Sequence, residues 1–447
     1  MRIGLAKIDI TPRVGVPLCG FGPFLNRVSV AVRDRLWARA MAVEQGGRRV
    51  VIVSCDLLGV SGATTAAVRE RLRKTVGLEP SAVMIVCTHT HSGPDTLADL
   101  IGWGGFDPPY MELLPRRIAA AVEHAVADLA DADLLHAQTP CEGIGLNREQ
   151  DRDAPPLEEV LLDGWRPAKP ELTDTTCHVL KVVRDGRVRG FVSYFSCHPV
   201  VCCQANHQIH GDYAGVATNL LEREYPGSVG LFLQGANGDI NSCVVHKGEQ
   251  ESLLALDVIA ARYANAVRRG LHEAQPIKVD TVCTVLQDVA FKRRPWIADE
   301  VRAKLKAEET SLADPQATDA DTEYRLAVVR TLGLRRILTR LESAAEMSPP
   351  IQLQGLRIGP VALLASPFEA FRQIKAEVQA AARAPLALVV SLANDSLGYA
   401  PDRLAIARGG YASDMVPLMY GIKPFAELHE ELPAALLALD VALDASD

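Results

Sequence analysis

"RRVVIVSCDLLGV", from Arg48 to Val60, decides the fold class of this chain of 447 residues. The stretch is a continuous apolar run that ends at Asp56, which is typical of a buried strand. The next segment, 61–77, spaces its apolar residues as a helix does and begins with Ser61, a suitable N-cap; a second apolar run follows at 82–88. Strand, helix and strand in this order predict a βαβ unit, and sites in such sheets lie beyond the carboxyl ends of the strands.

The rest of the chain predicts more strands and helices of this kind. The segment 177–200 alternates apolar and polar residues on both sides of Asp185-Gly186, which is a strong hairpin signal. No internal repeat, low-complexity tract or flexible linker is apparent. We therefore expect one α/β domain, 1–447, with layered mixed β-sheets flanked by helices and a helical insertion at about 296–347. Further helices are expected at 111–129 and 213–224, and a second hairpin leading into a helix at 351–371.

Composition and charge exclude several classes of function. The formal net charge is −8 without a long basic run, so we expect a small-molecule substrate and neither nucleic acid nor membrane as a partner. Lys7 and Asp9 interrupt the apolar N-terminal stretch, which is unlike a signal peptide and predicts a cytoplasmic protein. No apolar run is long enough to span a bilayer, and the ten scattered cysteines lack a CxxC pair, so we expect them to be reduced and mostly buried. Nothing in the sequence indicates the oligomeric state.

Histidines follow two of the predicted strands. His89 and His91 end the stretch "VMIVCTHTH", and residues at i and i+2 of a strand share a face, so their imidazoles could bind one ion. A single histidine at a strand end usually fills an ordinary polar role. His198, however, ends a different strand and is followed by Pro199. Two strand ends that both finish in histidine favour a shared metal site.

Other polar residues near predicted strand ends are weaker candidates. His210 and Asp212 lie just before a predicted helix, where a carboxylate is most often an N-cap. Glu369 is expected to start a helix, whose dipole by itself favours a carboxylate. The turn "QGANGDIN", 234–241, has no P-loop lysine. Its small residues could instead let backbone N–H groups stabilise a substrate oxyanion. The residues of this expected oxyanion turn are Gly235, Asn237, Gly238 and Asp239.

An ordered set of short motifs resembles one known family, the neutral/alkaline non-lysosomal ceramidases, in their N-terminal catalytic domain. The set extends from residue 8 to about 400, so the resemblance covers most of the chain and implies a ceramidase-like catalytic fold. The motifs, in chain order, are "IDITP", "THTHSGP", "LNR", "CHP", "GDYAG", "QGANGDIN", "SPFEAF" and "LGYAP".

The resemblance implies a site and an activity. The implied Zn²⁺ ligands are His89, His198, Glu369 and Tyr399. His91 and Arg148 would line the site, His91 as proton shuttle and Arg148 as one group that stabilises the charge on oxygen. Asn241 stands where the family has a serine implicated in ceramide cleavage, and from the chain length we expect no counterpart of the family's C-terminal β-domain. We therefore expect a zinc-dependent hydrolase that cleaves a linear amide, or an ester or lactone, of a small polar substrate by a metal-activated water.

Two alternatives remain open from the sequence. In a two-metal hydrolase, His91, His210, Asp56 or Asp212 would hold a second ion. In the one-metal enzyme, Asp56 and Asp212 would instead fix the tautomers of the ligand histidines. A catalytically degenerate member would bind a metal or ligand without turnover, and Asn241 in place of serine motivates that second alternative.

Overall fold

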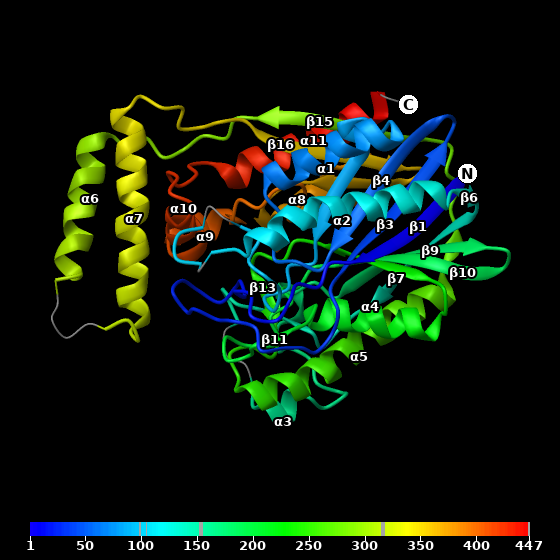
Figure 1. Ribbon diagram of the computed structural model, residues 1–447, viewed down its shortest axis with the longest axis horizontal. Helices are drawn as coiled ribbons and strands as arrows, with labels where there is room; N and C mark the ends of the chain where they lie inside the picture. The colour runs from blue at the N-terminus through cyan, green and yellow to red at the C-terminus, as the bar shows by residue number, and fades with distance from the viewer. Residues whose placement is uncertain (98–99, 104, 152–154, 314–317, 446–447) are drawn as a thin grey trace.

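Three mixed β-sheets form the centre of the computed structural model, which describes residues 1–97, 100–103, 105–151, 155–313 and 318–445 (Figure 1). The first sheet has the order β5–β4–β3–β1–β6, and α1 and α2 cover its outer face. The bounds are β1 Arg2–Asp9, β3 Trp37–Gln45, β4 Arg48–Cys55, α1 Gly62–Val76, β5 Val83–Cys87, α2 Pro108–Ala127 and β6 Ala130–Asp131.

The second and third sheets are also covered by two helices each. The second has the order β12–β10–β9–β7–β14 and lies under α4 and α5, and the third has the order β15–β16–β17–β19 and lies under α8 and α11. The second comprises β7 Asp133–Pro140, β9 Thr176–Arg184, β10 Arg187–Phe195, α4 Asp212–Glu224, β12 Val229–Gln234, α5 Glu249–Glu273 and β14 Gln275–Pro276. The third comprises β15 Val282–Val289, β16 Ile351–Ile358, β17 Val361–Ala365, α8 Arg372–Ala381, β19 Leu386–Val390 and α11 Leu428–Ala445.

Shorter elements lie around these sheets. Three two-stranded pairs are β2 Ala31–Val32 with β11 Gln208–Ile209, β8 Gly145–Asn147 with β13 Ile240–Ser242, and β18 Glu369–Ala370 with β20 Tyr399–Ala400. The remaining helices are η1 Pro80–Ala82, α3 Leu157–Val160, η2 Pro170–Leu172, α6 Ala298–Ser311, α7 Thr322–Glu342, α9 Arg403–Arg408, η3 Tyr411–Met415 and α10 Val416–Met419.

Each large sheet contains the same local unit: an antiparallel hairpin, one helix, and a strand parallel to the second strand of the hairpin. The three units are β3–β4–α1–β5, β9–β10–α4–β12 and β16–β17–α8–β19. The predicted βαβ unit at 48–88 is the first of them, and the three-fold recurrence was not visible in the sequence. The helix of each unit forms the crossover between two parallel strands. Because these strands run in the same direction, their carboxyl ends lie at the same edge of the sheet.

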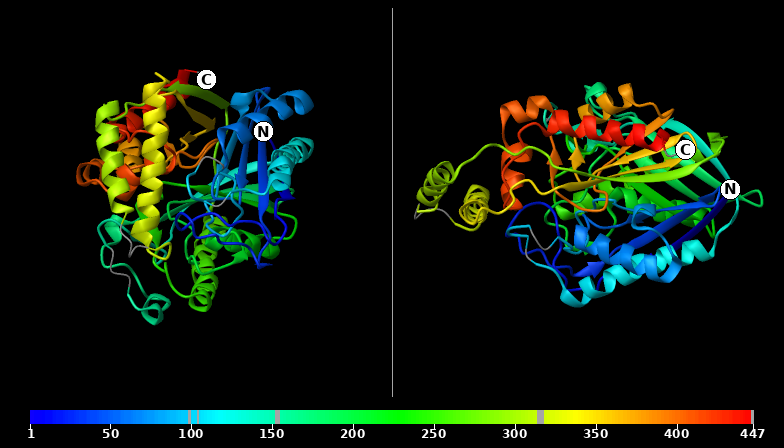
Figure 2. Two further views of the ribbon diagram at one scale, coloured as in Figure 1. Left: turned by 60° about the vertical axis from the view of Figure 1, so that its left-hand side comes forward. Right: turned by 90° about the horizontal axis from the view of Figure 1, so that it is seen from above.

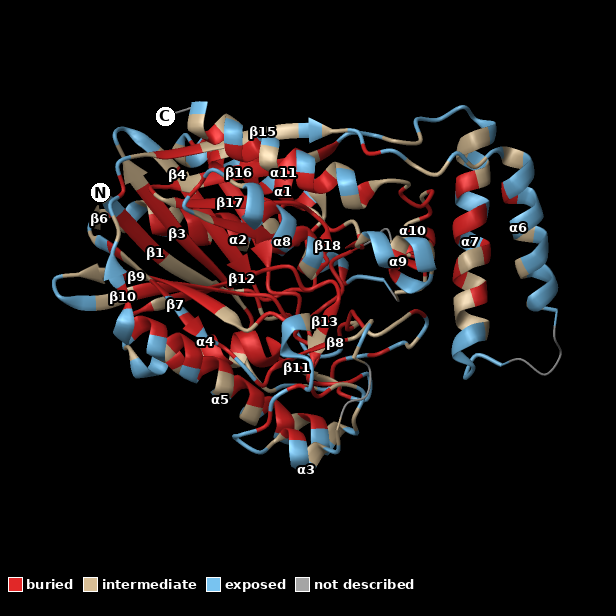
Figure 3. Ribbon diagram, turned by 180° about the vertical axis from the view of Figure 1, so that it is seen from behind, coloured by how far each residue is buried: buried red, intermediate tan, exposed pale blue. Residues whose placement is uncertain are grey.

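The main core lies where the inner faces of the three sheets meet. Met41 of the first sheet, Leu231 of the second and Leu363 of the third belong to one buried cluster. Figure 3 shows the strands that carry these residues, β3, β12 and β17, mostly buried, and the view from above in Figure 2 shows helices on the outer faces. Burying one such side chain contributes about 1.5–3 kcal/mol. The predicted α/β class, with layered mixed sheets flanked by helices, is confirmed.

The helices α6 and α7 lie within the stretch expected to hold a helical insertion. In Figures 1 and 2, α7 lies between α6 and the rest of the molecule. It packs closely on α10, because a Cβ added to Gly333 would lie 2.3 Å from the carbonyl oxygen of Leu418. A residue larger than glycine at this position would therefore push α7 away from α10.

The structure confirms the predicted helix cap and hairpin turn, but it places Glu369 differently. The Ser61 side chain accepts a hydrogen bond from Thr64 N–H and caps α1. Asp185 and Gly186 have φ angles of 53° and 70° and connect β9 to β10. The expectation that Glu369 starts a helix was wrong: it lies in β18 and its N–H donates to Gly398 O, while α8 begins three residues later. Among the described residues, no helix is long and apolar enough to cross a membrane.

Candidate metal centre

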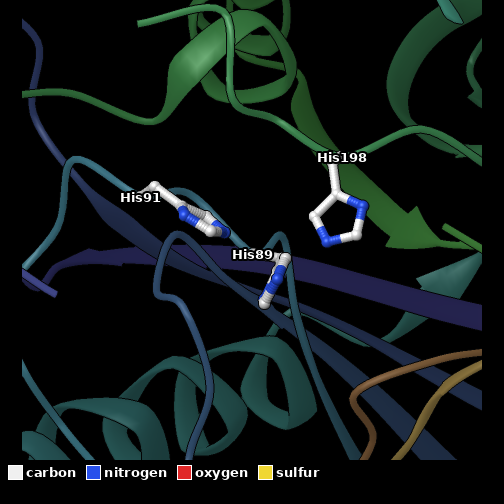
Figure 4. A group of neighbouring side chains, drawn as sticks. All are labelled: His89, His91 and His198. Atoms are coloured by element: carbon white, nitrogen blue, oxygen red, sulfur yellow. The ribbon is translucent and has the colours of Figure 1, made fainter. Parts of the chain in front are cut away.

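Three histidines from two strand ends point toward one another (Figure 4). His89 and His91 follow β5, and His198 follows β10. One ring nitrogen of each lies within 4.8 Å of the others. The ring centroids of His89 and His91 are 4.8 Å apart, and those of His89 and His198 are 5.0 Å apart. The sheets therefore bring together the histidines that the sequence singled out.

The backbone at His89 differs from the expected strand. Its φ is 72°, in the left-handed region, and its N–H donates to Leu57 O. His89 and His91 thus lie beyond β5, so the alternation of side chains along a strand does not explain why their rings are close. The loop geometry explains it instead. A left-handed residue at this point redirects the chain and brings both rings to the same side.

Backbone carbonyls fix one nitrogen of each of two rings. His89 Nδ1 lies 2.8 Å from Leu58 O, and His198 Nδ1 lies 2.6 Å from Asn237 O. A carbonyl only accepts hydrogen bonds, so in both rings Nδ1 carries the proton and Nε2 presents its lone pair. This corrects the expectation that Asp56 and Asp212 fix these tautomers.

Glu369 lies opposite the two Nε2 atoms. Its Oε2 is 2.7 Å from His198 Nε2 and 3.3 Å from His89 Nε2. Burial opposes the charge of Glu369, but the neighbouring His89 and His198 hold the pKa of the carboxyl well below its usual range. Burial also lowers the pKa of His198 to about 4, which disfavours an imidazolium. Two lone pairs and a carboxylate therefore converge without enough protons between them, and a shared cation would satisfy all three.

Tyr399 and Arg148 complete this side of the site. Tyr399 is the register partner of Glu369 in the β18–β20 pair, so both side chains reach the site from adjacent backbones. The Arg148 guanidinium lies 4.7 Å from the centre of the Tyr399 ring. Burial lowers the pKa of Arg148, but Tyr399 and Glu369 reverse this and raise it above its ordinary value. Its Nε and Nη2 are buried without a hydrogen-bond partner among the described residues, so their N–H groups are unsatisfied.

His91 is the histidine of the cluster that the protein leaves unbound. Neither of its ring nitrogens has a hydrogen-bond partner among the residues described, although both are buried. Burial, together with the neighbouring His89 and His198, lowers the pKa of His91 well below its ordinary value. Its Nδ1 also limits the loop at Gly20 (φ 102°), where an added Cβ would lie 2.5 Å away. A neutral imidazole is thus held in place without being engaged.

These residues line one cavity of about 390 Å³. That volume is near the lower end of the usual range for ligand pockets, about 300–1,000 Å³. A second cavity, of about 810 Å³, is lined by Arg69, Asp288 and others but by no histidine. Of the predicted site residues, the smaller cavity is lined by His89, His91, Arg148, His198, Asn241, Glu369 and Tyr399.

The expected oxyanion turn does not line this cavity with its glycines. Gly235 N–H donates to Phe195 O and Gly238 N–H donates to Ala370 O, so neither is available to a substrate. The Asp239 carboxylate accepts the N–H of Arg372 and an N–H of the Asn147 amide, and the Asn237 carbonyl holds His198. The turn therefore supports β18 and His198 from behind, and Asn241 is its member at the cavity wall.

The other expected residues lie in separate polar clusters. Asp56 is 2.6 Å from Arg39, which also contacts Glu222, in a buried ion-pair network. His210 and Asp212 form a second group with Cys202, whose candidate ligand atoms also lie within 4.8 Å of one another. All ten cysteines are buried and none forms a disulfide in the structure.

Several cavity residues were missed by reasoning from the sequence. Tyr411 and His246 line the cavity, and so do Arg325 and Leu326 of α7. Tyr411 lies near Arg148, and its pKa is raised to about 12 by burial. None of these residues follows a predicted strand, which was the signal used to select candidates. The amphipathic pattern of α7 gave no indication of which end faces the site.

Comparisons with known proteins agree with this architecture. The neutral ceramidase of Pseudomonas aeruginosa is 29% identical over 253 residues, and that of Mycobacterium tuberculosis is 25% identical over 264 residues. Both alignments cover 54% of this chain, but only 37% and 40% of those proteins. The chain therefore matches well under half the length of these relatives.

Solved structures share the fold over a longer range. The crystal structure of neutral ceramidase from Pseudomonas aeruginosa matches 100% of this chain and 74% of that chain, with a TM-score of 0.77 and 22% identity. A structure described as ceramidase complexed with C2 matches with the same TM-score and identity. Residues 1–251, more than half of the 447, match the family model described as neutral/alkaline non-lysosomal ceramidase, N-terminal. The resemblance expected from the motifs is thus confirmed, and this chain belongs to the neutral/alkaline non-lysosomal ceramidase family.

Proposed function

We propose that this protein is a zinc-dependent hydrolase that cleaves the amide bond of a small polar substrate. The observation that carries the proposal is the convergence of His89 Nε2 and His198 Nε2 on the Glu369 carboxylate, without enough protons to bind all three. Nitrogen and oxygen donors of these types are the usual ligands of a catalytic zinc. Relatives that bear the name neutral ceramidase support hydrolysis of an amide as the reaction class.

The residues that would hold the ion are His89, His198, Glu369 and Tyr399. When bound there, Zn²⁺ acts as a Lewis acid and lowers the pKa of water toward about 7. Leu58 O and Asn237 O orient the two imidazoles through their Nδ1–H groups. Such carbonyl contacts also make the imidazoles better ligands.

The chain itself supplies the proton transfers. His91 is neutral and unbound, so it can accept a proton from the attacking water and donate it to the leaving amine. The unpartnered N–H groups of Arg148 can stabilise negative charge that develops on the carbonyl oxygen. The Asn241 amide can donate one more hydrogen bond from the cavity wall.

The substrate inferred here is smaller than ceramide. Asn241 lacks the hydroxyl of the family's serine, and an amide is neither a nucleophile nor a proton relay. The cavity of about 390 Å³ also favours a short substrate. The two-metal alternative has less support, because the Asp212 carboxylate and His210 Nδ1 already accept backbone N–H groups.

A substrate screen with zinc-loaded protein tests the proposal. We expect about one zinc per chain and hydrolysis of short N-acyl compounds at rates well above that of long-chain ceramide. Asn241→Ser should alter kcat on short amides by less than about tenfold, the scale of a single neutral hydrogen bond. Esters and lactones in the same panel determine whether the enzyme requires an amide. Two zinc equivalents would favour the two-metal enzyme, and zinc binding without hydrolysis of any compound would favour a degenerate member.

A further inference from the structure

The N-terminal turn of α7 forms part of the wall of the metal-site cavity. Thr322, Arg325 and Leu326 line it together with the histidines. Val329, one turn further along, belongs to the same buried cluster as Tyr399. The close approach of Gly333 to Leu418 fixes α7 at a second point. The cavity is therefore shaped by α7 as well as by the three sheets.

Arg325 is the charged side chain that α7 brings to this wall. Its Nη1 donates to Asp319 O at 2.6 Å and its Nη2 donates to Thr322 Oγ1 at 3.1 Å. Both acceptors are neutral. Its Nε is buried and has no partner among the described residues. These contacts orient the guanidinium and leave its charge without a carboxylate partner within the part of the chain that the structure describes.

Two other arginines of α7 do have carboxylate partners on α6. Arg330 lies 2.9 Å from Glu308, and Arg335 lies 2.8 Å from Glu309. The two acidic residues nearest to Arg325 in sequence are occupied, since Asp321 caps α7 and Glu323 pairs with Arg330. Arg325 thus differs from Arg330 and Arg335 on the same helix, which both face a carboxylate.

The charges of the cavity favour an anionic group on the substrate. Among the described residues, the charged ones that line it are Arg148, Arg325 and Glu369. Glu369 already faces two histidines, and Arg148 lies against Tyr399 beside them. Arg325 stands on another element, and the cavity wall also includes the apolar residues Leu326, Leu100 and Trp103. An excess of positive charge with an apolar wall suits a molecule that carries a carboxylate and a short apolar chain.

We propose that Arg325 determines specificity by binding a substrate carboxylate, so that the substrate class is N-acyl amino acids with short apolar acyl groups. This inference rests on the proposed amide hydrolysis, since it places the carboxylate on the amine part of the amide. Arginine binds carboxylates through paired N–H groups, and charged hydrogen bonds of this kind are among the stronger ones. Binding would provide the anion that Arg325 lacks.

A matched pair of compounds tests the inference: N-hexanoylglycine and its neutral analogue N-hexanoylglycinamide, with released hexanoate as the measured product. In the zinc-loaded wild type we expect a higher kcat/KM for the carboxylate. Arg325→Met should lower that kcat/KM by roughly 10- to 100-fold, mostly through KM, and should change the value for the neutral amide less than about twofold. Arg325→Lys should restore part of the preference. Arg330 lies on the same helix but pairs with Glu308, so Arg330→Met is the matched control and should leave kcat/KM unchanged for both substrates.

The same compounds separate failure of the inference from failure of the proposed function. Hydrolysis of both without a carboxylate preference, or an equal loss for both in Arg325→Met, would overturn the role of Arg325 while leaving the hydrolase intact. If neither compound is cleaved, calorimetric titration with N-hexanoylglycine still tests whether Arg325 binds the carboxylate. Binding that is lost in Arg325→Met would support the inference and contradict the hydrolase, and an absence of binding to wild type would contradict both.

Discussion

Two buried clusters in this protein contain residue types that bind metals, and their hydrogen bonds differ. In the first, the Nε2 atoms of His89 and His198 face the Glu369 carboxylate, so that acceptors face one another. In the second, the Asp212 carboxylate accepts the N–H groups of Val201, Cys202 and Tyr213. The residue types are alike, but only the first cluster lacks hydrogen-bond donors.

The charges around the two clusters also make the second cluster less suited to a cation. Burial, assisted by Arg33 and Arg27, lowers the pKa of His210 to about 3, so nearby positive charge already surrounds the second cluster. Its His210 Nδ1 also accepts Asp212 N–H at 3.1 Å. A cation placed there would have to displace these bonds and approach two guanidinium groups. Proximity of histidine, cysteine and aspartate is therefore a poor criterion for a metal site unless their lone pairs are free.

The largest expected effect is on metal content. His198→Ala should abolish zinc binding and hydrolysis, because it removes a proposed nitrogen ligand that the protein orients through Asn237 O. Cys202→Ser should retain about one zinc per chain, the content that we also expect for wild type. Elemental analysis of the purified variants measures this, with circular dichroism to establish that each is folded. Full zinc in folded His198→Ala, or its loss in folded Cys202→Ser, would reverse the assignment of the two clusters.

The next effect separates the ligands from the proton carrier within the first cluster. Because His91 is neutral and has no bonded partner among the described residues, His91→Ala should keep its zinc. Its kcat should fall by roughly 10²- to 10⁴-fold, the usual contribution of a positioned general acid or base. Steady-state kinetics on zinc-loaded protein, with metal content measured in parallel, provides both values. Loss of zinc would make His91 a ligand, and an unchanged kcat would give it no part in proton transfer.

Much of the first cluster could be predicted from the sequence because its determinants are local. The apolar runs before His89 and His198 predicted strands, and β5 and β10 end two and three residues before them. The turn at Asp185-Gly186 was equally local, since glycine tolerates the positive φ that such a turn needs. Strand ends in mixed α/β sheets then indicated where side chains would gather.

The remaining features depend on contacts between distant segments. Glu369 looked like the start of a helix, but pairing with Tyr399, 30 positions later, makes it part of a strand. His89, whose φ is positive, donates its N–H to the carbonyl oxygen of Leu57, which lies in the connection between β4 and α1. Arg325 faces the cavity because α7 packs on α10 and on the cluster around Tyr399. No local pattern of apolar residues contains this information.

The smallest expected effect tests whether the second cluster is purely structural, and it concerns stability instead of activity. Burial raises the pKa of Asp212 to about 6, although the backbone N–H groups partly offset this. The folded protein therefore binds a proton more tightly than the unfolded chain, whose aspartate has a pKa of about 3.9. The contribution of Asp212 to stability is full below about pH 4 and is lost as the pH rises through about 6.

Asp212→Asn removes this titratable group, so the variant is the control for the pH dependence of wild-type stability. As the pH falls from about 7 to about 5, the thermal midpoint of wild type should rise relative to that of Asp212→Asn. The effect of zinc release at low pH cancels in the difference between the two thermal midpoints, provided that both proteins carry the same metal. Zinc content and kcat at neutral pH should match in wild type and variant. A constant difference in midpoint across this range would show that Asp212 does not titrate there, and loss of zinc in the variant would return it to the metal-binding residues.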